Sequence, residues 1–204
     1  MVHMVDYISE VISFRGITNE KGDDPLRELR KFMGAWKRRD GTIKGEIYRS
    51  LRYDSDILIW FMAERPEDIY DAKSGACNIL KGYEATMGFL SIYKMRHRPK
   101  ERSGRHNYFV AYPMSKSPEW YLLDEAERKR IIAEHVGIAT KSKSNDEIIS
   151  YTTESFGIDD NEFVLIYELK SIANWVAVTE ELRHATARRW VVNERPILTG
   201  IRLD

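Results

Sequence analysis

Asp56-Ile-Leu-Ile-Trp-Phe-Met-Ala-Glu64 decides the fold, because a second segment of the same pattern follows later in the chain. The second segment is Glu162-Phe-Val-Leu-Ile-Tyr-Glu-Leu-Lys170. Each of its residues lies 106 positions after the equivalent residue of the first segment, since 162 − 56 = 106. Each segment is a short apolar run that leads into a helical pattern, as expected of a buried strand. The repeat predicts that the chain contains two copies of one structural unit.

The first copy has the element order of a ferredoxin-like unit. Apolar or alternating runs predict strands at Ile8–Phe14, Ile43–Tyr53, Ile57–Met62 and Thr86–Met95, and helical periodicity predicts helices at Pro25–Arg38 and Pro66–Leu80. The resulting order, β-α-β-β-α-β, defines the ferredoxin-like arrangement.

The second copy repeats this order. We predict strands at Tyr108–Pro113, Ile148–Phe156, Phe163–Leu169 and around Ile197–Ile201, with helices at Asp124–Thr140 and Ile172–Val191. Two such units bury most apolar surface if their sheets close on each other. We therefore predict an α+β fold, in which duplicated ferredoxin-like units, residues 1–100 and 101–204, form an antiparallel α+β barrel within one chain. The connection falls near residues 97–106.

Charge and cysteine content exclude several classes of function. Lys+Arg and Asp+Glu both total 32, so no basic field attracts nucleic acid or an anionic membrane. The single cysteine, Cys77, rules out an internal disulfide framework and a cysteine-based metal cluster. The start of the sequence has no secretion-signal pattern, and no apolar run reaches the length of a membrane span. We expect a cytoplasmic protein without nucleic-acid or membrane partners.

His135 is the most informative histidine. Ile131, Ile132, His135, Ile138 and Ala139 have helical spacing and share one face, so the imidazole points toward apolar surroundings. Phosphate-loop, serine-hydrolase and zinc-protease motifs are absent from the sequence. A histidine in this position is either a hydrogen-bonded core residue or a metal ligand, and the spacing alone favours the first.

The residues around His135 indicate a family. Tyr112-Pro-Met-Ser-Lys116, Glu119-Trp-Tyr-Leu-Leu123 and Ala133-Glu-His135 occur in that order, and Gly157-Ile-Asp-Asp160 follows. This series resembles the chlorite dismutase superfamily, which includes the haem-forming coproheme decarboxylases. The resemblance spans about Tyr108 to Gly200, and the fold of that family is a duplicated ferredoxin-like pair.

The resemblance implies an iron-porphyrin site in the second unit. It makes His135 the proximal iron ligand, and Tyr112 the tyrosine that is oxidised to a radical and abstracts hydrogen from a propionate. It makes Lys116 the residue that holds a propionate and supplies a proton. Arg98 is a candidate for helping Lys116 to hold the same propionate, and Ser150 or its neighbours occupy the region on the open side of the iron. The alternatives are a barrel-lining tyrosine, a solvated lysine and a solvated linker around Arg98.

Two departures from the family select among its activities. No arginine occurs from Lys141 to Asp160, whereas chlorite-decomposing members carry one there, so chlorite chemistry is disfavoured. The segment His184-Ala-Thr-Ala-Arg-Arg189 lacks the glutamate that many relatives place before it, so an acidic partner of the ligand histidine is expected to be lost.

Oxidative decarboxylation of iron coproporphyrin III to haem b by hydrogen peroxide is therefore our first hypothesis. The alternatives are a haem b enzyme acting on chlorite or peroxide, a non-catalytic haem-binding protein, and a barrel without a cofactor. The family also implies a homo-oligomer in the form of a closed, pentameric ring.

Overall fold

The computed structural model describes residues 5–17, 25–95 and 104–203. Its strands are β1 (Asp6–Gly16), β2 (Thr42–Ser50), β3 (Ile57–Ala63), β4 (Tyr83–Lys94), β5 (Tyr108–Lys116), β6 (Ile148–Glu154), β7 (Phe163–Leu169), β8 (Val191–Asn193) and β9 (Leu198–Arg202). Its helices are α1 (Pro25–Trp36), α2 (Pro66–Ile79), α3 (Pro118–Leu122), α4 (Glu125–Lys141) and α5 (Ile172–Leu182), with 3₁₀ helices η1 (Lys143–Glu147) and η2 (Thr186–Trp190). No helix of the described residues is long and apolar enough to cross a membrane.

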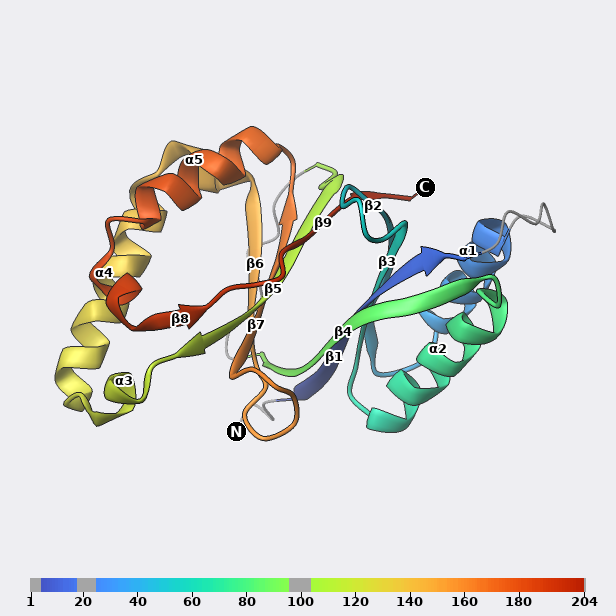
Figure 1. Cartoon of the computed structure of the whole chain (residues 1–204), viewed down its shortest axis with the longest axis horizontal. Coiled ribbons are helices and arrows are strands. Elements are labelled where there is room, and N and C mark those ends of the chain that lie inside the picture. Colours follow the sequence, from blue (N-terminus) through green and yellow to red (C-terminus); the bar gives the residue numbers. More distant parts are fainter. Residues whose placement is uncertain (1–4, 18–24, 96–103, 204) are drawn as a thin grey trace.

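The strands close into a barrel, which confirms the predicted α+β fold. The strand order is β7-β6-β4-β1-β3-β2-β9-β5, and β5 returns to pair with β7. Strands β1 to β4 form one ferredoxin-like sheet, and β5, β6, β7 and β9 form the other. The pairs β4–β6 and β2–β9 join the two sheets, and every pairing is antiparallel. In Figure 1 the two helical layers lie on opposite sides of the barrel.

Strand β3 shows why the repeated segment determines this fold. All seven residues of β3 are buried, because one face lines the barrel and the other lies under α1 and α2. Trp60 is on the inner face, where its indole nitrogen donates a hydrogen bond to the Ser9 hydroxyl at 3.0 Å and its ring contacts Phe109 and Tyr151. Ile59 and Phe61 are on the outer face. A strand covered on both faces becomes a continuous apolar run.

A buried ionic network crosses the barrel interior and joins the two halves. Glu168 of β7 accepts hydrogen bonds from the Lys44 ammonium and the Arg202 guanidinium, each at 2.6 Å, and from the Tyr151 hydroxyl at 2.8 Å. Arg202 also donates to Glu46 at 2.6 Å. Lys44 and Glu46 belong to the first half of the chain, so these contacts hold β2 against β7 and β9.

The helix predicted over Ile172–Val191 is wrong in its second half. Helix α5 ends at Leu182, and the chain continues through η2 into the short strand β8. The Thr186 amide and hydroxyl both donate hydrogen bonds to the Glu134 carboxylate of α4, which draws the chain away from the α5 axis. Val191 then pairs with the end of β5. These long-range contacts override a local pattern that is compatible with a continuing helix.

Candidate functional site

The candidate site lies on the outer face of the second sheet, beneath α4 and α5 (Figure 1). This face carries three tyrosines among its apolar residues, Tyr108, Tyr112 and Tyr167, whereas, among the described residues, the corresponding cluster of the first half has one, Tyr83. All three are partly buried and pack against a small cluster that includes Val110 and Val178. The face therefore combines apolar surface with hydroxyl groups.

Helix α4 holds His135 over this face. Asp124 caps the helix, accepting a hydrogen bond from the Ala126 amide at 2.8 Å. Ile131, one turn before His135, is fully buried and packs with Trp120. This anchor fixes the rotation of the helix, so the His135 side chain reaches partly buried surroundings.

The His135 imidazole is poised as a neutral base. Its Nδ1 atom is buried and has no hydrogen-bond partner among the described residues. Burial lowers the pKa of His135 below its ordinary value, and the positive charges of Lys116 and Arg188 lower it further. A neutral imidazole with an unused nitrogen is the form that binds a metal ion.

Lys116 lies at the end of β5, close enough to His135 to affect its pKa. Its ammonium donates a hydrogen bond to the Ala187 carbonyl at 3.2 Å and lies 4.7 Å from the centre of the Trp120 ring. Burial lowers the pKa of Lys116, and the neighbouring Arg188 lowers it further. No carboxylate of the described residues forms an ion pair with this ammonium, so it can bind an anionic group of a ligand.

Glu194, which the sequence analysis missed, is the acidic centre of this region. Its carboxylate forms ion pairs with Arg183, at 3.1 Å, and with Arg188. Burial raises the pKa of Glu194, but the two arginines outweigh burial and leave it below its ordinary value. The three side chains line a cavity of about 620 Å³. Glu194 follows β8, a strand that local patterns did not reveal, so no sequence signal identified it.

Two carboxylates lie near the His135 imidazole without bonding to it. Glu134 and Glu194 both raise the pKa of His135 through their charges, but neither accepts a hydrogen bond from its ring in the described structure. The Glu134 carboxylate accepts hydrogen bonds from Thr186, and the Glu194 carboxylate forms ion pairs with Arg183 and Arg188. Charged side chains therefore lie near the His135 imidazole without forming a hydrogen bond with it.

The structure brings Tyr112 and Ser150 together through Tyr167. The Tyr112 and Tyr167 rings are stacked, with centroids 6.0 Å apart, and the Tyr167 hydroxyl is within hydrogen-bonding reach of the Tyr112 hydroxyl and the Ser150 side chain. Burial raises the pKa of Tyr112 well above its ordinary value, so this phenol stays protonated. Both Tyr112 and Lys116 also sense the charge of Glu194, which places them in one region. Arg98 lies outside the described residues.

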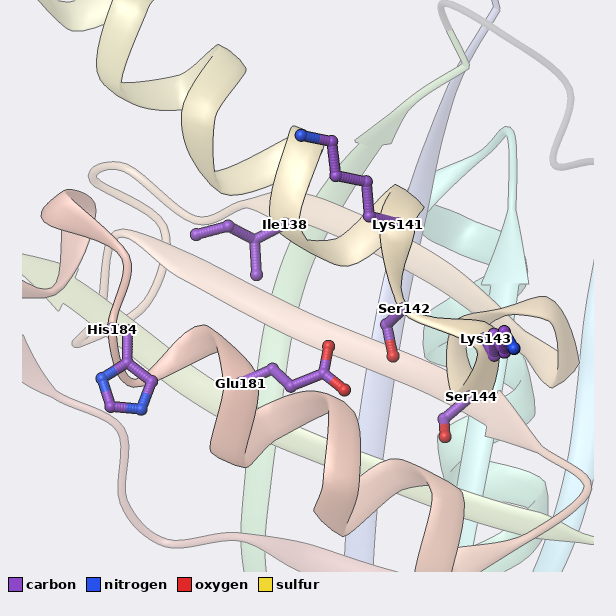
Figure 2. A pocket seen from close by; sticks show the side chains of 7 residues that line it. All are labelled: Ile138, Lys141, Ser142, Lys143, Ser144, Glu181 and His184. Atoms are coloured by element: carbon purple, nitrogen blue, oxygen red, sulfur yellow. The ribbon is translucent and has the colours of Figure 1, made fainter.

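A cavity of about 580 Å³ opens between the C-terminal parts of α4 and α5 (Figure 2). It begins at Ile138, about one turn after His135, and is bordered by Lys141, Ser142 and Lys143. The Ser142 hydroxyl is buried and has no partner among the described residues. On the α5 side, His184 and Glu181 face the same space. The region around His135 thus has basic groups both near the imidazole, Lys116 and Arg188, and at the C-terminal end of α4, Lys141 and Lys143.

The site residues fit an iron porphyrin. A porphyrin supplies four nitrogen ligands, so one protein imidazole is enough to hold its iron. The faces of the disk would contact the partly buried tyrosines that pack around the Val110 cluster, and its carboxylate-bearing edges would meet the cations of Lys116 and Lys141.

Comparison with known proteins gives consistent matches. Residues 24–203 match the family model described as chlorite dismutase. The coproheme decarboxylase of Mycolicibacterium smegmatis is 28% identical over 202 residues, which cover 93% of this chain and 85% of the relative.

Solved structures extend the match over almost the whole chain. A structure described provisionally as a chlorite dismutase is 38% identical, with a TM-score of 0.87, and the match covers 98% of this chain and 96% of that one. A haem-binding protein from Thermus thermophilus has a TM-score of 0.85 at 16% identity, with 99% and 93% covered, and supports the fold alone.

Proposed function

Since this chain belongs to the chlorite dismutase family, we propose that it is an iron-porphyrin oxidoreductase that uses hydrogen peroxide to decarboxylate iron coproporphyrin III, forming haem b. The observation that carries the proposal is the His135 imidazole, neutral, partly buried and with an unpartnered Nδ1. The coproheme decarboxylase of M. smegmatis, which matches 93% of the chain, supports the choice of reaction.

The reaction balances with one peroxide for each propionate. A propionate, one hydrogen peroxide and one proton give a vinyl group, carbon dioxide and two water molecules. The propionate side chain loses two electrons and the peroxide gains them. When bound, the iron supplies the redox chemistry that couples these two changes. The protein must fix the porphyrin, keep a reactive side chain at the propionate edge and manage the protons.

Tyr112 and Lys116 have the properties that this chemistry needs. The Tyr112 phenol is held protonated by burial, so it can give up a hydrogen atom and later regain one from a propionate. The Lys116 ammonium has no acidic partner among the described side chains and can hold the propionate carboxylate. Its lowered pKa also makes it a better proton donor than an exposed lysine.

The distribution of cations favours iron coproporphyrin over haem b as the substrate. Iron coproporphyrin has propionates at two opposite edges of the porphyrin ring, whereas haem b has them at one edge only. Lys116 and Arg188 lie near His135, whereas Lys141 and Lys143 lie at and just beyond the C-terminal end of α4. A Lys141→Gln/Lys143→Gln variant should therefore bind iron coproporphyrin more weakly than the wild type, whereas Lys129→Gln, on the exposed surface of the same helix, should not.

The side chains of β6 favour peroxide over chlorite. The strand carries no cation, and Ser150, the residue expected on the open side of the iron, is a neutral hydroxyl near Tyr167. An anionic oxidant such as chlorite would find no cation on β6 to pair with, whereas neutral hydrogen peroxide can donate and accept hydrogen bonds with a hydroxyl group.

An absorbance titration tests the iron site. Purified wild-type, His135→Ala and His184→Ala proteins are titrated with iron coproporphyrin and with haem b. We expect a saturable, histidine-ligated spectrum for the wild type and for His184→Ala, which changes a histidine at the cavity border. His135→Ala should lose that spectrum. Equal binding by all three proteins would refute His135 as the ligand, and absence of binding would indicate a family fold without a cofactor.

Product analysis tests the reaction. Iron coproporphyrin complexes of the wild type, Tyr112→Phe and Tyr83→Phe are treated with hydrogen peroxide, and the porphyrins are identified by mass spectrometry. Tyr83 is a partly buried tyrosine of the first half, outside the site. The wild type and Tyr83→Phe should form divinyl product, while Tyr112→Phe should not. Undiminished decarboxylation by Tyr112→Phe would refute the role of Tyr112. Oxygen release from chlorite without decarboxylation would favour a chlorite dismutase-like enzyme, and haem transfer without turnover would favour a carrier.

We also propose a closed homo-oligomeric ring of five chains. Light scattering should give five times the 23.9 kDa mass of the chain. A single-chain mass would contradict the ring.

A further inference from the structure

Three aromatic side chains form a continuous path away from Tyr112. The Tyr112 ring stacks on Tyr167 at 6.0 Å with an interplanar angle of 21°. Tyr167 in turn contacts Trp175 of α5, with centroids 4.2 Å apart and planes inclined by 43°. The sheet register makes this possible, because Tyr167 pairs with Val110, two positions before Tyr112 on the same face of β5. The proposed function uses only the first member of this series.

Tyr167 is placed to exchange a hydrogen atom with Tyr112. The two phenol rings are stacked with centroids 6.0 Å apart, and each hydroxyl influences the pKa of the other, so a proton and an electron can move together between them. Ser150 lies within reach of the Tyr167 hydroxyl and can keep it oriented. Trp175, which packs on Tyr167, restricts the position of the Tyr167 ring. Two phenols in similar surroundings differ little in their affinity for hydrogen, which allows transfer in either direction.

We propose that Tyr167 is a second redox-active residue, which shares the oxidising equivalent of Tyr112. The inference rests on the proposed function, in which hydrogen peroxide and the bound iron oxidise Tyr112. In the exchange, the O–H bond of Tyr167 breaks, the O–H bond of Tyr112 forms, and the unpaired electron moves from the Tyr112 oxygen to the Tyr167 oxygen. No further oxidant is consumed. Tyr167 thus stores the equivalent whenever no propionate is within reach of Tyr112.

Electron paramagnetic resonance of the iron coproporphyrin complex, frozen soon after mixing with hydrogen peroxide, tests this proposal. The proteins compared are the wild type, Tyr112→Phe, Tyr167→Phe, the Tyr112→Phe/Tyr167→Phe double variant and, as a control, Tyr83→Phe. Tyr83 is a partly buried tyrosine that packs against the apolar cluster of the first half, outside the candidate site. Phenylalanine keeps each ring and its packing, and an absorbance titration shows first that every variant binds the porphyrin.

We expect a tyrosyl signal with contributions from both phenols in the wild type and in Tyr83→Phe. Tyr167→Phe should retain a signal with a changed hyperfine pattern, because the radical then resides on Tyr112 alone. In Tyr112→Phe and in the double variant the signal should fall to background, because Tyr167 is oxidised only through Tyr112. A Tyr167→Phe signal with the wild-type hyperfine pattern, or an undiminished signal in the double variant, would overturn the proposal. A Tyr167 signal in a sample that forms no vinyl product would refute the decarboxylase function but would support the radical exchange between Tyr112 and Tyr167. Failure of the proposed function can therefore be distinguished from failure of this inference.

Discussion

Removing the charge of Glu168 should destabilise the barrel far more than removing the charge of an exposed glutamate. The Glu168 side chain is 4% exposed and is the shared anion of Lys44 and Arg202, each at 2.6 Å. Glu168→Gln keeps the volume but leaves Lys44 without an anion in the barrel interior. The matched control is Glu154→Gln, because Glu154 also pairs with a lysine, Lys94, across the two halves, but with 32% and 36% of the side chains exposed.

The structure limits the magnitude of this loss. Breaking a buried ion pair by removing one partner costs about 3–5 kcal/mol, whereas an exposed pair contributes about 0–1 kcal/mol. Arg202 keeps Glu46 as a second anion, and the Lys44 side chain is 21% exposed. Both features lessen the penalty, so we expect Glu168→Gln to lower the free energy of unfolding by about 3 kcal/mol.

Urea unfolding at pH 7, followed by circular dichroism, gives the comparison. Adding Lys44→Met to Glu168→Gln removes the stranded cation and should recover more than half of the loss. Burial would raise the pKa of Glu168, but Lys44, Tyr151 and Arg202 outweigh it and hold the pKa below its ordinary value of 4.5. The stability from this ionisation is present above pH 4.5 and is lost as the pH falls through the lower folded-state pKa. The variant should therefore show a weaker acid dependence. An equal loss in Glu168→Gln and Glu154→Gln would refute the reasoning.

Three further predictions concern the site and its support. The His135 imidazole should titrate below its ordinary pKa of 6.5, and Lys116→Gln should raise that pKa in an NMR titration, since it removes a nearby cation; an unchanged pKa would contradict the contact. Because the unfolded state takes up this proton first, His135 contributes stability that is lost as the pH falls through 6.5. Gly200→Ala should cost about 1–3 kcal/mol by thermal unfolding, because its Cβ would lie 2.8 Å from the Tyr48 Cβ; a neutral effect would show that β9 can shift. Asp124→Ala should cost about 1 kcal/mol by removing the cap of the helix that carries His135, and Asp124→Asn, which keeps an accepting oxygen, should cost less.

The fold could be predicted because its signal is local and repeated. The apolar run at Ile57–Ala63 is a strand covered on both faces, and its copy at Phe163–Leu169 occupies the equivalent position in the second half, with Phe163 and Tyr167 only partly buried. Strand identity and order follow from such runs. Barrel closure follows from two sheets that each have one apolar face without a covering layer.

The site could be predicted only in part, because its remaining members depend on long-range contacts. Tyr167 belongs to the repeated segment itself, but only the pairing of β7 with β5 brings it to Tyr112. Glu194 approaches Lys116 because the chain turns after Leu182, and that turn depends on bonds between Thr186 and α4. The hydrophobic periodicity of one sequence shows neither the register in which β7 pairs with β5 nor the turn after Leu182.

The two halves of the duplication use the same architecture differently, and the difference lies in their helices. Helix α1 has 12 residues and buries Leu29, Met33 and Trp36, which fill the space above the first sheet. Helix α4 has 17 residues and buries only Ile131 among its side chains, although it covers the equivalent sheet of the second half. An apolar disk with charged edges would supply the missing contacts between α4 and the sheet, and binding to the folded state would stabilise it by mass action. On the proposed function, a porphyrin bound there would fill the incomplete core above the second sheet and would take one imidazole nitrogen of His135 as its ligand.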